Sequence, residues 1–149
     1  MNKKSLISYG DRTDKAMRTW VQIYKTYNRF SSEELKYFLN HELTFNQFKV
    51  LEVLYHRGDL NIGDITKLSL STPGNITVVI RNLKRDNWIT SISDPKDKRA
   101  NILSITQKGK DKMSKLFPQH AQNIHDYMDI LDDEELDTLY KLLRKVYKA

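Results

Sequence analysis

The sequence predicts a mainly α-helical protein with one small antiparallel β-hairpin, flanked on both sides by longer helices. Apolar residues recur at steps of three and four along most of the 149 residues, which is the helical period. Between residues 88 and 105 the period changes to two, as in paired strands. Side chains that cap helices stand before most of the helical stretches.

The first helical stretch lies in the N-terminal region, residues 1–42. Trp20, Tyr24, Tyr27 and Phe30 give it an aromatic face, and a bend is expected near residues 31–32. The face continues through later apolar residues of the same stretch. A single long helix with a strongly apolar side is therefore expected.

Three shorter helices follow. The first begins at Thr44, which can form a capping box with Gln47, and ends at Gly58. The second begins after Asn61 and the third after Thr72, with proline at its first position. The residues of the last two helices that are expected to face the core are Ile62, Ile65, Leu68, Ile76, Val79, Ile80 and Leu83.

A hairpin comes next, with strands expected at residues 88–92 and 101–105. Residues 94–99 read Asp-Pro-Lys-Asp-Lys-Arg, which is a turn cluster with a basic tip. Because these six residues are too many for a tight turn, the tip should project from the sheet.

Two further helices begin after Thr106 and Asp132, the latter in a second capping box with Glu135, and Pro118 can kink the first of them. The terminal helices carry more apolar surface than the small middle can cover, which predicts a homodimer. The alternative is a monomer whose terminal helices pack on its own core. The expected interface residues are Leu136, Leu139, Leu143 and Val146.

The charge distribution points to a polyanionic partner for the middle of the chain. The net charge is +6 and the pI is about 9.4. Residues 44–110 carry eleven basic and six acidic side chains, a net +5, whereas residues 111–149 carry six and eight, a net −2.

A short helix, a turn, a second capped helix and a basic hairpin form the layout of a winged helix-turn-helix. The second helix fits the major groove of DNA, and its N-terminus offers N–H groups to phosphate. The alternatives are an ordinary helix start, an ordinary solvated turn, and a winged helix that binds a protein instead of DNA. The predicted DNA-binding residues are Ser71, Thr72, Pro73, Gly74, Asn75, Thr77, Val78 and Arg81 in the helix, and Lys96, Asp97, Lys98 and Arg99 in the tip.

Residues 43–109 resemble the MarR family of bacterial transcriptional regulators. The wing of that family reads Asp-Pro-x-Asp-x-Arg, as residues 94–99 do here, and its next helix opens Leu-Thr-x-x-Gly, where this chain has Ile-Thr-Gln-Lys-Gly. The resemblance implies a homodimer built from the terminal helices. It also implies that the helix from Thr72 reads the major groove and that Arg99 enters the minor groove, oriented by Asp97.

The chain departs from the family pattern at three positions. Lys98 replaces the first of two wing arginines, Asn87 replaces a glycine before the first strand, and Ser91 replaces a common arginine. These changes bear on backbone contacts and sequence preference and leave the expected architecture unchanged.

The resemblance also implies a small effector, often phenolic, bound between the dimerisation and DNA-binding parts. Residues 117–120 and 131–135 resemble family members that respond to quinones and phenols. Without cysteine the chain cannot sense them by thiol chemistry, so reversible binding is expected. The alternative is that its aromatic residues are only core and interface. The candidate ligand-binding residues are Trp20, Tyr24, Tyr27, Tyr37 and His41.

Several function classes are excluded. The four histidines lack a metal-binding spacing, although a site of His and carboxylates alone stays open, and no phosphate loop or nucleophile elbow is present, so neither an enzyme nor a cofactor is expected. No stretch approaches the ~20 apolar residues of a membrane span. The sequence therefore predicts a cytoplasmic, nucleoid-associated regulator that binds a palindromic double-stranded operator as a homodimer. We expect a repressor that a small phenolic or quinone-like ligand releases, divided into residues 1–42, 43–106 and 107–149 of one intertwined fold, the middle part binding DNA.

Overall fold

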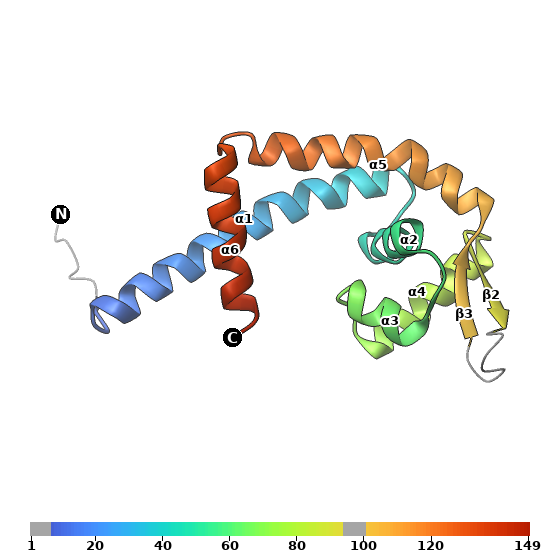
Figure 1. Ribbon diagram of the computed structural model, residues 1–149, viewed down its shortest axis with the longest axis horizontal. Coiled ribbons are helices and arrows are strands. Elements are labelled where there is room, and N and C mark those ends of the chain that lie inside the picture. The colour runs from blue at the N-terminus through green and yellow to red at the C-terminus, as the bar shows by residue number, and fades with distance from the viewer. Residues whose placement is uncertain (1–6, 94–100) are drawn as a thin grey trace.

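The computed structural model describes residues 7–93 and 101–149. It is mainly helical with one small antiparallel sheet, which confirms the predicted fold class (Figure 1). In chain order the elements are α1 (Asp11–Asn40), α2 (Phe45–Arg57), β1 (Leu60–Asn61), α3 (Ile62–Leu68), α4 (Pro73–Arg85), β2 (Ile89–Ser93), β3 (Asn101–Ile105), α5 (Gln107–Met128) and α6 (Asp133–Tyr147).

The helix starts lie where the capping side chains predicted them. The Thr44 hydroxyl accepts from the Gln47 N–H at 3.2 Å, and the Gln47 side chain accepts from the Thr44 N–H at 2.9 Å. Asp132 and Glu135 form the same reciprocal pair before α6. Gly58 ends α2 with a φ of 79°, a conformation that costs glycine little. Local side-chain chemistry therefore sets these boundaries.

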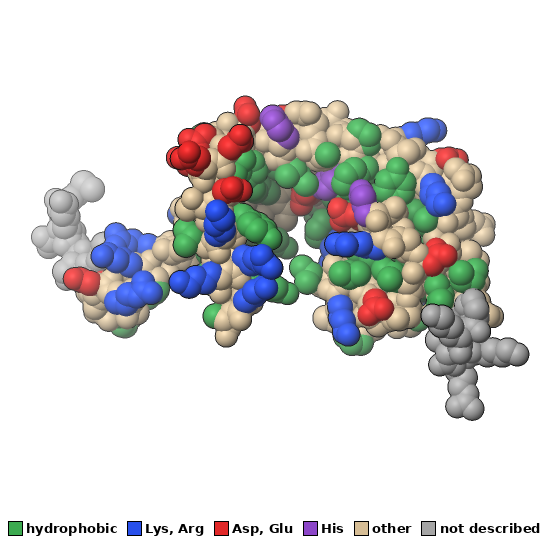
Figure 2. Space-filling view, in the orientation of Figure 1, with side chains coloured by type: hydrophobic (Ala, Val, Ile, Leu, Met, Phe, Trp, Pro, Cys, Tyr) green, Lys and Arg blue, Asp and Glu red, His purple; other side chains and the backbone are tan. Residues whose placement is uncertain are grey.

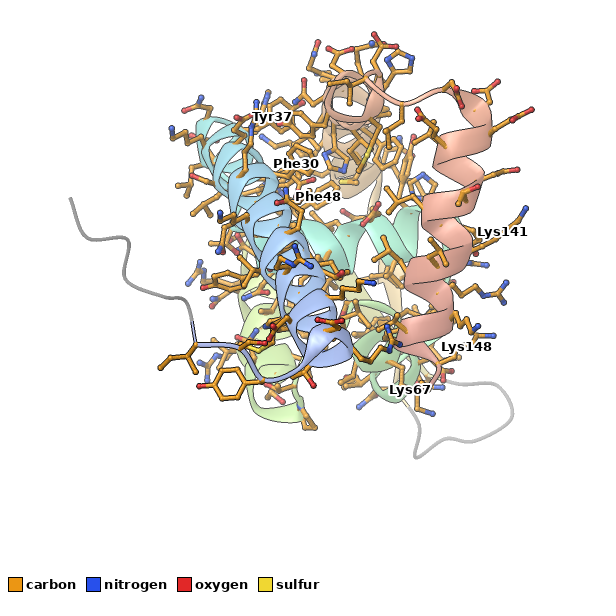
Figure 3. The ribbon with its side chains drawn as sticks, turned by 90° about the vertical axis from the view of Figure 1, so that its left-hand side faces the viewer. Phe30, Tyr37, Phe48, Lys67, Lys141 and Lys148 are labelled. Atoms are coloured by element: carbon orange, nitrogen blue, oxygen red, sulfur yellow. The ribbon has the colours of Figure 1, made fainter. Side chains whose placement is uncertain are left out.

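Two predicted irregularities do not interrupt their helices. α1 runs as one helix through residues 31–32, and α5 continues past Pro118. The two helices lie side by side, because Phe30 stacks on Tyr127 with ring centroids 4.7 Å apart and the Tyr37 hydroxyl donates to the Leu116 carbonyl at 2.7 Å. Figures 1 and 3 both show this pairing.

The sheet has three strands instead of the two that were predicted. β2 and β3 pair antiparallel from Ile89 opposite Ile105 to Ser93 opposite Asn101. β1 adds to the other edge of β3, with Leu60 opposite Leu103. β1 spans two residues, which is too short to show an alternating pattern, so the sequence analysis missed it.

The core lies where α2, α4 and the sheet meet the ends of α1 and α5. Of the seven predicted core residues of α3 and α4, Ile62 and Leu68 were wrong, with exposed fractions of 39% and 48%. α3 is only seven residues long, so a single residue, Ile65, faces the core while the two ends of the helix stay at the surface. The largest fully buried side chains include Phe38, Phe48, Leu51, Ile65, Leu83, Leu103, Met113 and Leu116.

The C-terminal helix α6 stands apart from the core. None of its side chains is buried, although Leu139, Leu143 and Val146 lie on one apolar stripe, and Val146 is 71% exposed. α6 overlaps α1 in Figure 1, but the turned view in Figure 3 separates the two helices. Hydrophobic side chains border the gap between α6 and the rest of the chain (Figure 2). The chain's own core therefore does not cover α6.

Candidate nucleic-acid interface

A tight turn sets the angle between α3 and α4. The Ser71 N–H donates to the Thr66 carbonyl at 3.0 Å, and the Ser69 hydroxyl donates to that of Ser71 at 2.9 Å. Between them Leu70 has a φ of 52°, a left-handed conformation that few non-glycine residues adopt. The turn therefore orients α4 through backbone geometry as well as through packing.

The first turn of α4 is capped but open to solvent. The Thr72 side-chain oxygen accepts from the Asn75 N–H at 3.4 Å, and Pro73 has no N–H to donate. Within the described ranges only the Gly74 N–H of this turn lacks a partner, fewer than the sequence analysis expected. A Cβ placed on Gly74 would meet no atom within 4 Å, so packing within the chain does not require glycine there.

α4 separates its apolar and polar residues onto opposite faces. Ile76, Val79, Ile80 and Leu83 are buried, as the spacing predicted. The predicted DNA-binding residues of the helix gather on the other face, where Ser71 is half-buried and the exposed set is Thr72, Pro73, Gly74, Asn75, Thr77, Val78 and Arg81. This face is free to enter a groove.

The end of α4 and the start of the sheet are tied to the N-terminus of α5. The Lys108 ammonium donates to the Asp86 carbonyl at 2.8 Å. Thr106 donates through its hydroxyl to the Asn87 carbonyl at 2.8 Å and through its N–H to the Trp88 carbonyl at 3.1 Å. These bonds hold α4, β2 and α5 in one rigid arrangement.

Two arginines of α4 have different surroundings. The Arg85 guanidinium bonds the Asp86 carboxylate at 2.8 Å, and this pairing raises the pKa of Arg85 and lowers the pKa of Asp86. Arg81 lies on the exposed polar face and forms no ion pair within residues 7–93 and 101–149. Arg81 is therefore the α4 arginine available to a partner.

The predicted tip residues Lys96, Asp97, Lys98 and Arg99 lie outside the described residues. The strands that lead to them end at the paired residues Ser93 and Asn101. This end of the sheet is opposite to the end where Ile105 leads into α5.

The structure does not bring the five candidate ligand-binding residues together. Trp20, Tyr24 and Tyr27 are exposed along the first half of α1, and Trp20 is 66% exposed. Tyr37 packs against His41 with ring centroids 4.6 Å apart. Seventeen residues of α-helix span about 25 Å, so Trp20 and Tyr37 do not line one small cavity within a single chain.

A cavity of about 280 Å³ lies instead between α1, α2, α5 and the turn before α4. Glu34, Glu52 and His120 line it from three different helices, together with Phe48 and Leu70. Burial raises the pKa of both carboxyl groups and lowers the pKa of the imidazole. The sequence analysis had no signal for this site, because residues 34, 52 and 120 share no local spacing.

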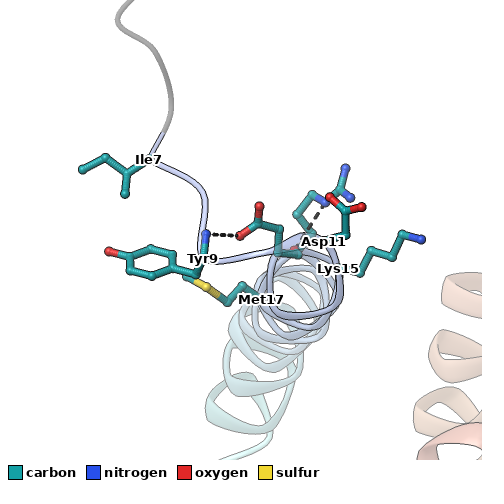
Figure 4. Close-up of a pocket in the computed structure, with 7 residues that line it drawn as sticks. Ile7, Tyr9, Asp11, Lys15 and Met17 are labelled. Carbon is teal, nitrogen blue, oxygen red and sulfur yellow. Dashed lines mark hydrogen bonds between the residues drawn. The ribbon is translucent and has the colours of Figure 1, made fainter.

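A second cavity, of about 390 Å³, lies at the N-terminal end of α1 (Figure 4). Tyr9 and Met17 border it, and the Tyr9 N–H donates to Asp14 at 3.0 Å. It is formed by the first described residues and the first turns of α1, far along the chain from α4.

Two searches of the described part of the chain returned nothing. No group of three or more His, Asp or Glu side chains there gathers closely enough to hold a metal ion. No helix there is both long and apolar enough to cross a membrane.

Comparison with known proteins gives concordant matches. The model of the MarR family matches residues 43–100. The HTH-type transcriptional regulator MhqR of Bacillus subtilis is 29% identical over 134 residues, which is 90% of this chain and 92% of MhqR. The uncharacterized HTH-type transcriptional regulator YkoM of the same species is 31% identical over 135 residues, 91% of this chain and 88% of YkoM.

A solved structure matches the fold over most of its length. It is a mutant MarR from E. coli complexed with operator DNA, with a TM-score of 0.75 and 21% identity, covering 92% of this chain and 99% of that one. At this identity the likeness concerns the fold.

Proposed function

Since this chain belongs to the MarR family, and is therefore a DNA-binding transcriptional regulator and not an enzyme, we propose that it binds a palindromic operator as a homodimer. The observation that carries the proposal is the polar face of α4, which is exposed along its length while the opposite face is fixed in the core. A helix held in this way can lie in a major groove about 12 Å wide.

Each exposed group of α4 suits a particular DNA contact. The unpaired Gly74 N–H and the positive end of the helix dipole suit a phosphate. Asn75 and Thr77 suit base edges, and Val78 suits a thymine methyl. Arg81, with no ion pair in the described part of the chain, suits a guanine or a phosphate.

The role of the wing tip rests on the family resemblance of residues 94–99. We propose that Arg99 enters an adjacent minor groove, that Asp97 orients it, and that Lys96 and Lys98 contact phosphates. Replacing Arg99 with alanine tests this assignment separately from the assignment of α4.

The proposed dimer uses the terminal helices. The stripe of Leu136, Leu139, Leu143 and Val146 is left uncovered by the chain's own core, and a 15-residue helix without packing is marginally stable in water. A second copy would cover this stripe together with the exposed aromatic residues of α1. Two-fold symmetry then places the two α4 helices about 34–36 Å apart, one turn of DNA.

The proposed division is residues 1–42 and 107–149 for dimerisation and residues 43–106 for DNA binding. We further propose that the protein is a repressor acting at the nucleoid in the cytoplasm, and that a small aromatic effector releases it. Such release needs only that the effector bind better to a dimer whose α4 helices no longer match the groove spacing.

Operator selection from random duplexes, followed by fluorescence anisotropy with the selected site, tests the proposal. Arg81→Ala should weaken operator binding by about 1–3 kcal/mol, or about 5- to 150-fold. Arg29→Ala removes an exposed arginine from α1 and should leave the affinity unchanged. Binding should also fall steeply with salt, with a log–log slope near −0.9 per phosphate contact.

The alternative, a winged helix that binds a protein, predicts different results. No duplex would be enriched by selection, and binding to DNA would be weak and indifferent to Arg81. Either result would reject the operator-binding function.

A further inference from the structure

The cavity between α1, α2, α5 and the turn before α4 lies at the junction of the two proposed parts of the protein. Glu34 comes from α1 and His120 from α5, which belong to the dimerisation part. Glu52 comes from α2, and Ser69 and Leu70 come from the turn that orients α4. A molecule in this cavity would contact both parts at once.

His120 is a buried polar side chain without a partner. Its exposed fraction is 4%, and its Nδ1 forms no hydrogen bond within residues 7–93 and 101–149. The nearest carboxylate oxygen, Oε1 of Glu34, is 3.8 Å away, beyond hydrogen-bond distance. Leaving such a group unpaired costs stability, and a structural role in the core does not require it.

The carboxylates of the cavity also lack partners. No Lys or Arg forms an ion pair with Glu34 or Glu52 in the described part of the chain. The one lysine that lines the cavity, Lys49, places its ammonium 5.3 Å from the centre of the Phe45 ring. Two carboxylates and one ammonium leave the cavity with a negative balance, and its buried groups are mainly hydrogen-bond acceptors.

The cavity is coupled to α4 through strained backbone. Leu70 lines it with a φ of 52°, and Ser69 lines it while bonding the hydroxyl of Ser71 at 2.9 Å. Thr72, the cap of α4, follows directly. A residue held in the left-handed region costs free energy, so a small shift of the turn is inexpensive and would reorient the start of α4.

We propose that this cavity binds the effector and that the effector is a small aromatic cation. Its charged N–H groups would donate to Glu34 and Glu52, its ring would lie against Phe48, and His120 would supply a further acceptor. This assignment rests on the proposed function, since it names the class of molecule that regulates operator binding.

Size and charge both restrict the occupant. At about 280 Å³ the cavity is at the lower limit of small-molecule sites, which suits one or two rings. A phenolate or carboxylate would face two like charges, and a quinone carbonyl would meet acceptors without donating to them. The polar groups of the cavity therefore favour a cation over the phenolic and quinone-like ligands that the family resemblance implies.

Three probes of nearly the same shape test the charge preference: benzamidinium, neutral benzamide and anionic benzoate. Isothermal titration calorimetry of the dimer should give saturable binding of benzamidinium, at least about tenfold tighter than that of benzamide or benzoate. Glu34→Gln and Glu52→Gln should each weaken benzamidinium binding about tenfold or more, because each removes one charge-assisted contact. Glu33→Gln removes the same charge from the neighbouring exposed position and should change nothing.

The proposal is overturned if benzamidinium does not bind, if benzamide or benzoate binds equally well or better, or if both glutamine variants bind benzamidinium as the wild type does. Operator affinity of each variant, measured without a probe, separates this failure from failure of the proposed function. Normal operator binding with no cation binding would reject the effector site alone.

Discussion

Two glycines in the first turns of helices should respond in opposite ways to the same substitution. A Cβ on Gly109 in α5 would lie 2.7 Å from Cγ1 of Ile105 and would collide with the Trp88 carbonyl oxygen. That carbonyl accepts from the N–H and from the hydroxyl of Thr106, both at 3.1 Å. The oxygen therefore cannot move away without breaking bonds that join α4, the sheet and α5.

Gly109→Ala should lower the free energy of unfolding by about 1–3 kcal/mol, the usual cost of forcing a methyl group into a packed region. Alanine's better helix propensity, worth up to about 1 kcal/mol, offsets part of the clash and places the net effect toward the lower half of this range. For a chain of this length each kcal/mol corresponds to about 2–4 °C in Tm. A fall of several degrees is therefore expected.

Gly74→Ala is the matched control. Its added Cβ meets open space at the start of α4, so only the helix propensity changes, and stability should stay the same or rise by up to about 1 kcal/mol. Urea and thermal unfolding at one fixed protomer concentration measure both variants, because dimerisation makes stability depend on concentration. An unaltered Gly109→Ala protein, or a Gly74→Ala protein that loses more stability than it, would refute the packing argument.

Two further substitutions test other regions. Leu139→Asp should dissociate the homodimer, which sedimentation would show as a halved mass, whereas Thr138→Asp places the same charge beside the stripe and should leave the mass unchanged; a dimeric Leu139→Asp protein would contradict the interface. Burial raises the pKa of Glu52 in the folded chain, so folding favours its protonated form and the wild type loses stability as pH rises through the glutamate range. Glu52→Gln should therefore be more stable than wild type at pH 7 in urea unfolding, with the difference vanishing at pH 4 or below. An equal or lower stability at pH 7 would contradict the desolvation of this carboxyl group.

Local chemistry made much of the fold predictable. Thr44, Thr72, Thr106 and Asp132 start helices because a side-chain oxygen can accept a first-turn N–H, and that bond involves residues only three positions apart. The buried stripe of α4 was predictable for the same reason, since a helix brings residues three and four apart onto one face. The exposed DNA-binding face followed as its complement.

Contacts between distant residues were not predictable in this way. β1 was missed because two residues carry no periodicity, and Ile62 and Leu68 were placed in the core because periodicity does not show how far a neighbouring element extends. The expected aromatic pocket was drawn from residues of one helix and its immediate end, which the helix itself spreads too far apart.

The order of helices and strands, their caps and the polar face of α4 were thus determined by the sequence alone, because they depend on groups within a few residues of one another. The junction of Glu34, Glu52 and His120, and the contact of Gly109 with the Trp88 carbonyl, were decided only by the tertiary structure. Each joins elements that are far apart in the chain, and no local interaction specifies where those elements meet.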